Sequence, residues 1–328
     1  MTRYARHIAF SFIAALLLSA SAIQAQENPY REEGWAKMAD GRRLGQMSAI
    51  DIDPAGNVWA LDRCGANSCA GSKVTPVVKF EPSGNYLTSF GAGLFIFPHG
   101  MHVDKEGNGW VTDADGKDGK GHQVIKFGPD GRVLLALGKA GVAGNATDMF
   151  NRPSAITTGP NGDIFVADGH GGESNARIVR FSKDGTFIKA WGKKGSGPGE
   201  FETLHAIAAD SKGRLFVGDR GNNRVQIFDQ DGNFIEEWKQ FGRPSGIFID
   251  RNDTIYVTDN QSDAKTNAGG KRGVRIGSVN DGKVKVFIPG LGGSPESQSA
   301  GEAVAADAAG NVYWAETNGR IIRKFVKK

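Results

Sequence analysis

Residues 49–63 read AIDIDPAGNVWALDR, and this pattern returns five more times along the chain of 328 residues. Each copy has an alternating apolar stretch, a polar turn that usually contains glycine, and a second stretch with an aromatic residue. Such a pattern predicts an antiparallel β-hairpin. The copies start 51, 55, 51, 40 and 57 residues apart. The further copies are GMHVDKEGNGWVTDA from Gly100, AITTGPNGDIFVADG from Ala155, AIAADSKGRLFVGDR from Ala206, GIFIDRNDTIYVTDN from Gly246 and AVAADAAGNVYWAET from Ala303.

A second hairpin follows the first in most repeats. The copies are VVKFEPSGNYLTSFG from Val77, VIKFGPDGRVLLALG from Val124, IVRFSKDGTFIKAWG from Ile178, VQIFDQDGNFIEEWK from Val225 and a degenerate VRIGSVNDGKVKVFI from Val274. Four strands at this period are typical of a propeller blade. The six repeats therefore predict an all-β, six-bladed β-propeller of the NHL-repeat kind. The sixth repeat has one outer strand, 321–326. We expect the segment GWAKMADGRRLGQ from Gly34 to complete that blade and remove its open edge.

The composition agrees with a fold of many short strands. Glycine, at 47 of 328 residues, is about twice as common as in average proteins, which indicates many tight turns. Residues 26–328 are expected to form one propeller domain.

Residues 1–25 have the features of a secretory signal peptide. Arg3 and Arg6 precede an apolar run at 8–18, and small residues predict cleavage after Ala22 or Ala25. Without these residues the net charge of +4 falls to +2, which gives no case for nucleic acid or an anionic membrane. No later segment is apolar and long enough to span a bilayer. We therefore expect a periplasmic or extracellular protein.

Two cysteines, Cys64 and Cys69, lie in the short segment RCGANSC at 63–69. Export favours a disulfide between them, with two free thiols as the alternative. Two thiols without a second pair do not make a zinc ribbon.

The residue before each inner strand predicts a functional ring. In a propeller the first strand of each blade lines the central channel, so equivalent positions lie at one depth. His99, His205 and Glu302 fall on alternate blades, about 120° apart, and could converge on one axial ion. Two imidazoles and a carboxylate suit zinc, with iron(II) as the alternative metal and hydrogen-bonded channel residues as the alternative role. The full ring is Ser48, His99, Ser154, His205, Ser245 and Glu302.

Two arginines end return strands near this ring. Arg63 and Arg220 could bind a substrate carboxylate through paired N–H donors. The alternative is that they form salt bridges with the neighbouring Asp62 and Asp219.

Other polar residues near strand ends have less specific signals. His170 could be a general base, an extra ligand or an exposed loop residue. His102 and His122 are expected to be structural. A recurrent aspartate at the end of the return strand is expected to bond turns and backbone; its copies include Asp113, Asp168, Asp219 and Asp259.

Several motifs resemble those of the peptidyl-α-hydroxyglycine α-amidating lyases (peptidylamidoglycolate lyases). The motifs are Phe97-Pro98-His99-Gly100-Met101, Trp110-Val111-Thr112-Asp113, His122-Gln123-Val124-Ile125-Lys126-Phe127, and the stretch from Asp168 to Phe181. The resemblance covers nearly the whole chain after the signal segment. The loop at 63–69 looks like that of exported bacterial NHL-repeat proteins related to these lyases.

The resemblance implies an axial zinc held by three histidines. His99 and His205 match two of them, and Glu302 stands at the third position. Arg63 and Arg220 match two active-site arginines. His170 replaces the tyrosine usually taken as the base. Ala303 stands where the family has a calcium-binding aspartate, which puts the calcium site in doubt, and the lyase's own disulfide positions are not filled.

These observations predict a metal-dependent lyase that cleaves the C–N bond of an N-acyl-α-hydroxyglycine-like substrate to an amide and glyoxylate. The substrate would be a small molecule or peptide with a carboxylate. A metal-dependent hydrolase or lactonase on the same site is one alternative. A non-catalytic module that binds a protein or ligand through its polar loops at 260–273 and 289–301 is the other.

Overall fold

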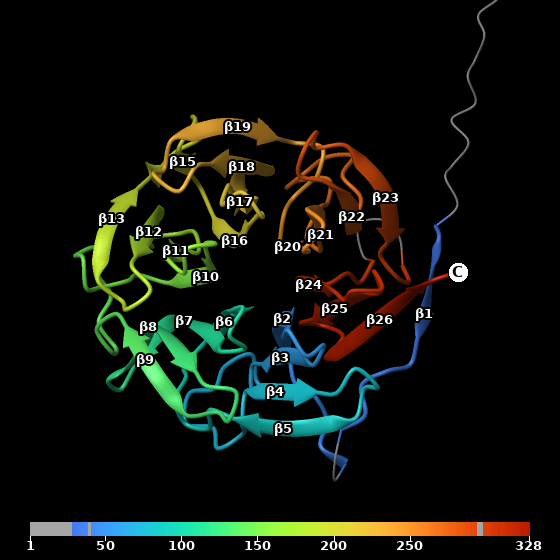
Figure 1. Cartoon of the computed structure of the whole chain (residues 1–328), viewed down its shortest axis with the longest axis horizontal. Coiled ribbons are helices and arrows are strands. Elements are labelled where there is room, and N and C mark those ends of the chain that lie inside the picture. The colour runs from blue at the N-terminus through green and yellow to red at the C-terminus, as the bar shows by residue number, and fades with distance from the viewer. Residues whose placement is uncertain (1–27, 39–40, 294–297) are drawn as a thin grey trace, which may run out of the picture.

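The computed structural model describes residues 28–38, 41–293 and 298–328. Six four-stranded antiparallel sheets surround a central axis, which confirms the predicted all-β, six-bladed propeller (Figure 1). The predicted signal peptide lies outside the described residues. Within the part of the chain that is described, no helix has the length and apolar character needed to cross a membrane.

The first three blades follow the repeats in chain order. Their strands are β2 (Met47–Ile52), β3 (Val58–Asp62), β4 (Val77–Phe80) and β5 (Tyr86–Phe90); β6 (Pro98–Val103), β7 (Gly109–Lys117), β8 (Lys120–Phe127) and β9 (Val133–Leu137); and β10 (Pro153–Thr158), β11 (Ile164–Asp168), β12 (Arg177–Phe181) and β13 (Phe187–Trp191). In each blade the first strand is innermost and the fourth is at the rim (Figure 1).

The remaining blades have the same order. Their strands are β16 (Leu204–Ala209), β17 (Leu215–Asp219), β18 (Arg224–Phe228) and β19 (Phe234–Trp238); β20 (Gly246–Ile249), β21 (Thr254–Asp259), β22 (Gly273–Ser278) and β23 (Val284–Pro289); and β24 (Ala303–Ala306), β25 (Val312–Glu316), β26 (Ile321–Lys327) and β1 (Tyr30–Glu33). A short parallel pair, β14 (Lys193–Lys194) and β15 (Glu200–Phe201), precedes blade four.

Both ends of the chain contribute to blade six. Strand β1 pairs antiparallel with β26, with Tyr30 opposite Lys327 and Glu33 opposite Lys324 (Figure 1). The closing strand therefore lies just before the segment from Gly34 that we expected to form it. Beyond Glu33 the chain leaves the edge of the sheet, and Trp35 packs into the apolar cluster between blades six and one.

Five of the six inner hairpin turns begin with an aspartate and share one hydrogen-bond pattern, whereas the turn of blade three begins with Gly159. In blade one, Asp53 Oδ1 accepts the backbone N–H groups of Ala55 and Asn57 at 3.0 and 2.8 Å, and Gly56 adopts a φ of +86°. The other carboxylate oxygen accepts the indole N–H of Trp59 at 3.1 Å. The conserved spacing within the repeats thus reflects a turn in which one carboxylate satisfies several donors.

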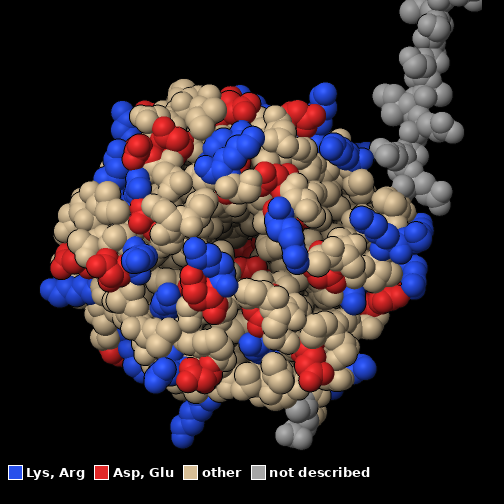
Figure 2. Space-filling model, in the orientation of Figure 1, with Lys and Arg blue, Asp and Glu red and all other residues tan. Residues whose placement is uncertain are grey.

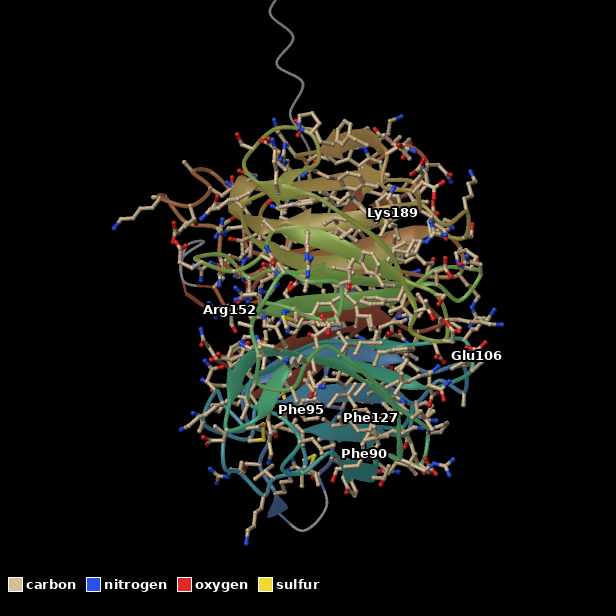
Figure 3. The ribbon with its side chains drawn as sticks, turned by 90° about the vertical axis from the view of Figure 1, so that its left-hand side faces the viewer. Phe90, Phe95, Glu106, Phe127, Arg152 and Lys189 are labelled. Atoms are coloured by element: carbon tan, nitrogen blue, oxygen red, sulfur yellow. A yellow bond between two sulfur atoms is a disulfide. The ribbon has the colours of Figure 1, made fainter. Side chains whose placement is uncertain are left out.

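Apolar clusters hold the blades together. Each of six clusters lies between two neighbouring blades, so most strands are buried on both faces. Between blades one and two, the ring of Phe127 lies 5.3 Å from that of Phe90 and 6.0 Å from that of Phe95 (Figure 3). This face-to-face packing of sheets fixes the inner strands around the axis.

The two faces of the disc differ. Arg152, which precedes β10, and Glu106, in the β6–β7 turn, lie on opposite faces (Figure 3). Figure 2 shows that the face toward the viewer is hollowed at its centre, with lysine and arginine side chains at the edge of the hollow. On the side of Glu106 there is a cavity of about 750 Å³ whose lining also includes Lys105 and Arg251.

Candidate metal centre

The predicted ring residues occupy β-bulges in the first four blades. In blade four, Leu204 pairs with Asp219 and Ala206 with Gly218, so His205 is an extra residue in the inner strand. A bulge re-aims a side chain, which explains how a residue in a buried strand can face the axis. The same register shift occurs at Ser48, at His99 and at Ser154.

Small residues follow the bulges because neighbouring inner strands approach closely. A Cβ atom on Gly100 would lie 2.5 Å from the carbonyl oxygen of Ser154 and 2.8 Å from the Cα of Ala155. Glycine at this position lets blades two and three come together beside His99.

The tautomers of His99 and His205 are fixed by the backbone. Nδ1 of His99 lies 2.7 Å from the carbonyl oxygen of Ser154, and Nδ1 of His205 lies 2.6 Å from that of Ser245. A carbonyl oxygen only accepts, so Nδ1 carries the hydrogen in both rings and the neutral Nε2 carries a lone pair. Both Nε2 atoms are buried without a hydrogen-bond partner. This is the arrangement of metal-ligating histidines.

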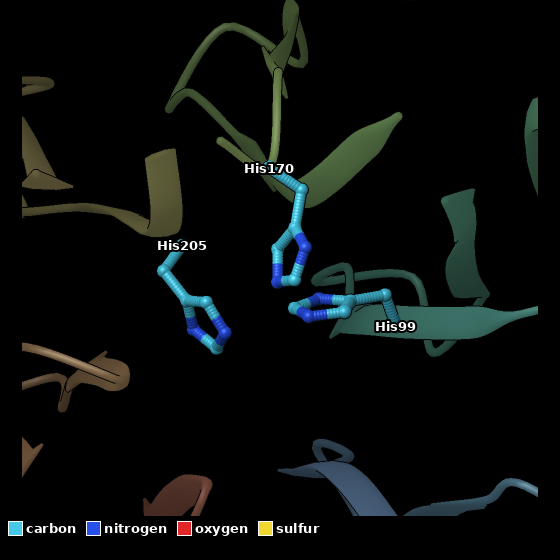
Figure 4. Close-up of side chains that lie close together, drawn as sticks. All are labelled: His99, His170 and His205. Atoms are coloured by element: carbon cyan, nitrogen blue, oxygen red, sulfur yellow. The ribbon is translucent and has the colours of Figure 1, made fainter. Parts of the chain in front are cut away.

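His170 reaches the same place from a loop after β11. Gly169, Gly171 and Gly172 all have positive φ, and a Cβ atom on Gly169 would lie 1.9 Å from the carbonyl oxygen of Asn175. The loop is closed by a 2.8 Å hydrogen bond from the His170 N–H to Ser174 Oγ. This tight turn directs the His170 imidazole toward the axis (Figure 4).

The three imidazoles form one group. Their ring centroids are 4.4 Å apart for His99 and His170, 4.7 Å for His99 and His205, and 5.1 Å for His170 and His205. One ring nitrogen of each lies within 4.8 Å of those of the other two (Figure 4). The group could therefore hold a metal ion, and its orphaned nitrogen lone pairs fit one chemically.

Glu302 lies beside this group rather than at its centre. Its Oε1 is 3.2 Å from Nε2 of His205, and its Oε2 accepts a hydrogen bond from Asn260. Burial would raise the pKa of Glu302, but the positive charges of Arg220 and Arg63 help to hold it well below its usual value. Glu302 is therefore a buried carboxylate facing an imidazole lone pair, an arrangement that a shared cation would relieve.

The environment keeps the three imidazoles neutral. Burial, the largest cause, lowers the pKa values of His99, His170 and His205. Arg63 lowers that of His99 further, and Arg220 lowers those of the other two. Neutral imidazoles are what a metal ion requires.

Both predicted arginines are at the site and both have spare donors. Arg63 is buried, with Nη2 lacking a hydrogen-bond partner, and Arg220 is buried with Nε unpartnered. Burial lowers the pKa of Arg220 to about 10 despite the opposing effect of Glu302. The alternative pairing is not observed: Asp62 pairs with Arg42 at 3.1 Å, and Asp219 pairs with Arg224 at 2.9 Å.

Sequence reasoning missed Asn260. It follows the return strand of blade five, at the repeat position that Arg63 and Arg220 occupy in blades one and four. Its Oδ1 accepts a 2.5 Å hydrogen bond from Ser245 Oγ, and its amide donates to Glu302. The repeat alignment contained the signal, since a polar residue at that position faces the ring.

The other predicted polar residues lie where expected. Cys64 and Cys69 form a disulfide, which indicates an oxidising compartment. His102 bonds Thr158 Oγ1 at 2.9 Å, and His122 accepts the N–H of Arg152 at 3.3 Å; neither joins the metal group. The recurrent aspartates bond backbone N–H groups, as those of blades two to five show.

A narrow cavity of about 50 Å³ continues along the axis below the ring, lined by residues such as Ile50, Ile156 and Ile207. That volume holds only one or two water molecules. This part of the channel is therefore too small for a ligand of more than a few atoms.

Comparison with known proteins agrees with this fold, and several of the related proteins are named as enzymes. A family model described as a 6-bladed beta-propeller matches residues 150–237. The chain is 34% identical over 201 residues to peptidyl-glycine alpha-amidating monooxygenase A of Xenopus laevis (54% of this chain, 21% of that protein). It is 34% identical over 176 residues to peptidyl-alpha-hydroxyglycine alpha-amidating lyase 1 of Drosophila melanogaster (47% and 30%). It is 29% identical over 194 residues to NHL repeat-containing protein 3 of Mus musculus (57% and 53%).

The match therefore spans between about a fifth and about a half of the length of these relatives. Among solved structures, a gluconolactonase from Xanthomonas campestris superposes with a TM-score of 0.59 at 14% identity, covering 87% of each chain. Virginiamycin B lyase from Staphylococcus aureus gives 0.54 at 17% identity, covering 90% of this chain and 87% of that one. The chain is thus a six-bladed propeller whose homologues include amidating lyases and NHL-repeat proteins. At these identities the solved structures support the fold alone.

Proposed function

We propose that this protein is an exported, metal-dependent lyase that cleaves the C–N bond of an N-acyl-α-hydroxyglycine-like substrate to an amide and glyoxylate. The observation that carries the proposal is the pair of Nε2 lone pairs of His99 and His205, fixed by backbone carbonyls and buried without a hydrogen-bond partner. The similarity to amidating enzymes supports the choice of reaction.

His99, His205 and Glu302 would hold the metal. The 3.2 Å between His205 Nε2 and Glu302 Oε1 is close to the separation of two ligand atoms that each lie about 2.1 Å from one ion. Nitrogen and carboxylate donors suit zinc best, and iron(II) is the alternative. When bound, the ion would supply Lewis acidity at the hydroxyl of the substrate.

Arg63 and Arg220 would bind the substrate carboxylate. Their unpartnered donors, Nη2 and Nε, are buried, so an anion that reaches them is desolvated and strongly attracted. Among the described residues, Glu302 is the one carboxylate whose charge acts on both guanidiniums, so the site has more positive than negative charge and favours an anionic ligand.

His170 would carry the proton. In this reaction the C–N bond breaks, the hydroxyl proton leaves oxygen, and a proton arrives on the amide nitrogen. Unlike His99 and His205, His170 has no hydrogen bond among the described residues that fixes which ring nitrogen is protonated. It can therefore accept the proton from the hydroxyl oxygen and donate a proton to the amide nitrogen.

The test combines metal content with product analysis. The untagged protein, purified without added metal, should contain about one transition-metal ion per chain and release glyoxylate from an N-acyl-α-hydroxyglycine. His99→Ala should lose both the metal and the turnover. Retention of either, or lactone opening without glyoxylate release, would contradict the lyase.

A hydrolase or lactonase is the second candidate, because the gluconolactonase shares the fold. Water activated at the same centre would then be the nucleophile. A parallel assay of lactone hydrolysis on the same preparation separates the two reactions.

A further inference from the structure

Arg63 is held from three sides by its surroundings. Its Nε donates to the carbonyl oxygen of Pro98 at 3.1 Å, and its Nη1 donates to Asn67 Oδ1 at 3.2 Å. The guanidinium carbon lies 4.2 Å from the centre of the Phe97 ring. These contacts leave Nη2 as the one guanidinium nitrogen without a partner, and they determine where it points.

Asn67 belongs to the loop that the Cys64–Cys69 disulfide closes. Cys64 and Asn67 both adopt left-handed backbone conformations, with φ of +53° and +52°. Such conformations are uncommon for residues other than glycine, although asparagine tolerates them best. A loop of this shape needs a constraint to persist, and the disulfide supplies one.

The same loop is anchored to the segment that leads to His99. The N–H of Cys69 donates to the carbonyl oxygen of Ile96 at 2.8 Å, and Ser68 Oγ donates to the same oxygen at 3.2 Å. The loop therefore lies over the start of β6, close to both Arg63 and the predicted metal ligands. The disulfide and the two hydrogen bonds to Ile96 therefore hold Asn67 against Arg63.

We propose that Asn67 is a positioning residue for Arg63 and that the disulfide loop is a specificity element for carboxylate ligands. The loop fixes the Asn67 amide oxygen, which orients the guanidinium so that its free Nη2 faces the site. The inference rests on the proposed function only for the identity of the anion. The predicted effect is on ligand binding and leaves the metal untouched.

The experiment measures binding rather than turnover. Calorimetry compares N-benzoylglycine, which has the acyl amide and the carboxylate, with N-benzoylglycinamide, which lacks the charge. Asn67→Gly removes the amide oxygen and keeps the left-handed backbone accessible. We expect it to weaken N-benzoylglycine binding by about tenfold, the order expected when binding must immobilise a side chain that was previously held in place, with metal content and N-benzoylglycinamide binding unchanged.

Controls separate positioning from general loosening of the loop. Ala66→Gly changes the neighbouring residue and should bind both ligands as the native protein does. Cys64→Ser/Cys69→Ser should weaken N-benzoylglycine binding to a similar extent, and adding Asn67→Gly should weaken it little further, because both act through one contact.

Three results would overturn the inference. In the first, Asn67→Gly binds N-benzoylglycine as the native protein does, although Arg63→Ala abolishes this binding. In the second, Asn67→Gly loses affinity equally for both ligands. In the third, the native protein does not bind N-benzoylglycine. Failure of glyoxylate release with N-benzoylglycine binding intact would contradict the lyase and leave this inference standing.

Discussion

The side-chain amide of Asn260 donates a hydrogen bond to Oε2 of Glu302. The other carboxylate oxygen, Oε1, then faces Nε2 of His205 at 3.2 Å. Ser245 links this pair back to blade four, since its Oγ donates to Asn260 and its carbonyl oxygen accepts from His205 Nδ1. Blades four, five and six are thereby joined at the axis by one network of hydrogen bonds.

Asn260→Ala should weaken metal binding because it frees the Glu302 carboxylate to rotate. Loss of a residue that orients a ligand typically costs about 10- to 100-fold in metal affinity. Competition with a chromophoric chelator measures this directly. Asn252→Ala, in the exposed turn of the same blade, is the control. Equal affinity in the two variants would show that Asn260 does not support the site.

His170→Ala distinguishes a proton carrier from a metal ligand. If His170 moves the proton, the variant should keep its metal while turnover falls by about 10²- to 10⁴-fold. Elemental analysis and the rate of glyoxylate release, on the same preparation, give both quantities. If His170→Ala instead loses as much metal as His99→Ala is expected to lose, His170 is a ligand. His102→Gln, which alters a histidine outside the group, should change neither.

Asp113 should make the stability of the fold depend on pH. Burial raises its pKa to about 7, although the N–H groups of Ile96 and Phe97 oppose this and Asp115 adds to it. The folded state therefore retains a proton that the unfolded state loses near pH 4, so stability falls as the pH rises from about 4 to 7, by about 1.4 kcal/mol per unit at most.

Urea unfolding at pH 5 and pH 8 tests this expectation. The native protein should lose stability from pH 5 to pH 8, and Asp113→Asn should lose less. Asp118→Asn, in an exposed turn, should lose as much as the native protein. Parallel behaviour of native protein and Asp113→Asn would disprove it.

Tyr30 should be important for closure of the ring. It is 5% exposed in the cluster between blades five and six, and its hydroxyl donates to the carbonyl oxygen of Gly310 at 3.1 Å. Tyr30→Ala should lower the free energy of unfolding by about 3 kcal/mol, as for other large aromatic truncations. Tyr30→Phe, which removes only the hydroxyl, should cost about 1 kcal/mol. Native-like stability of Tyr30→Ala in urea unfolding would mean that β1 does not contribute to closure.

The arrangement of the strands was predictable from the sequence. Six hairpin repeats, five of which begin their turn with an aspartate, specify strand order, blade number and which strand is innermost, because these depend on local alternation and turn chemistry. The same alignment assigned His99, His205 and Glu302 to equivalent positions of one ring, and Arg63 and Arg220 to the ends of strands near it. It also showed a polar residue at Asn260, whose importance was not recognised.

Tertiary structure alone decided how the axial side chains meet. The bulges that turn His99 and His205 inward depend on pairing with the next strand, and the position of His170 depends on a glycine loop that no periodicity describes. The closing strand likewise lies before Gly34, because Trp35 packs between blades six and one instead of continuing the strand. Repeated local chemistry therefore determined the scaffold, whereas the three-dimensional packing of non-repeated residues determined the site.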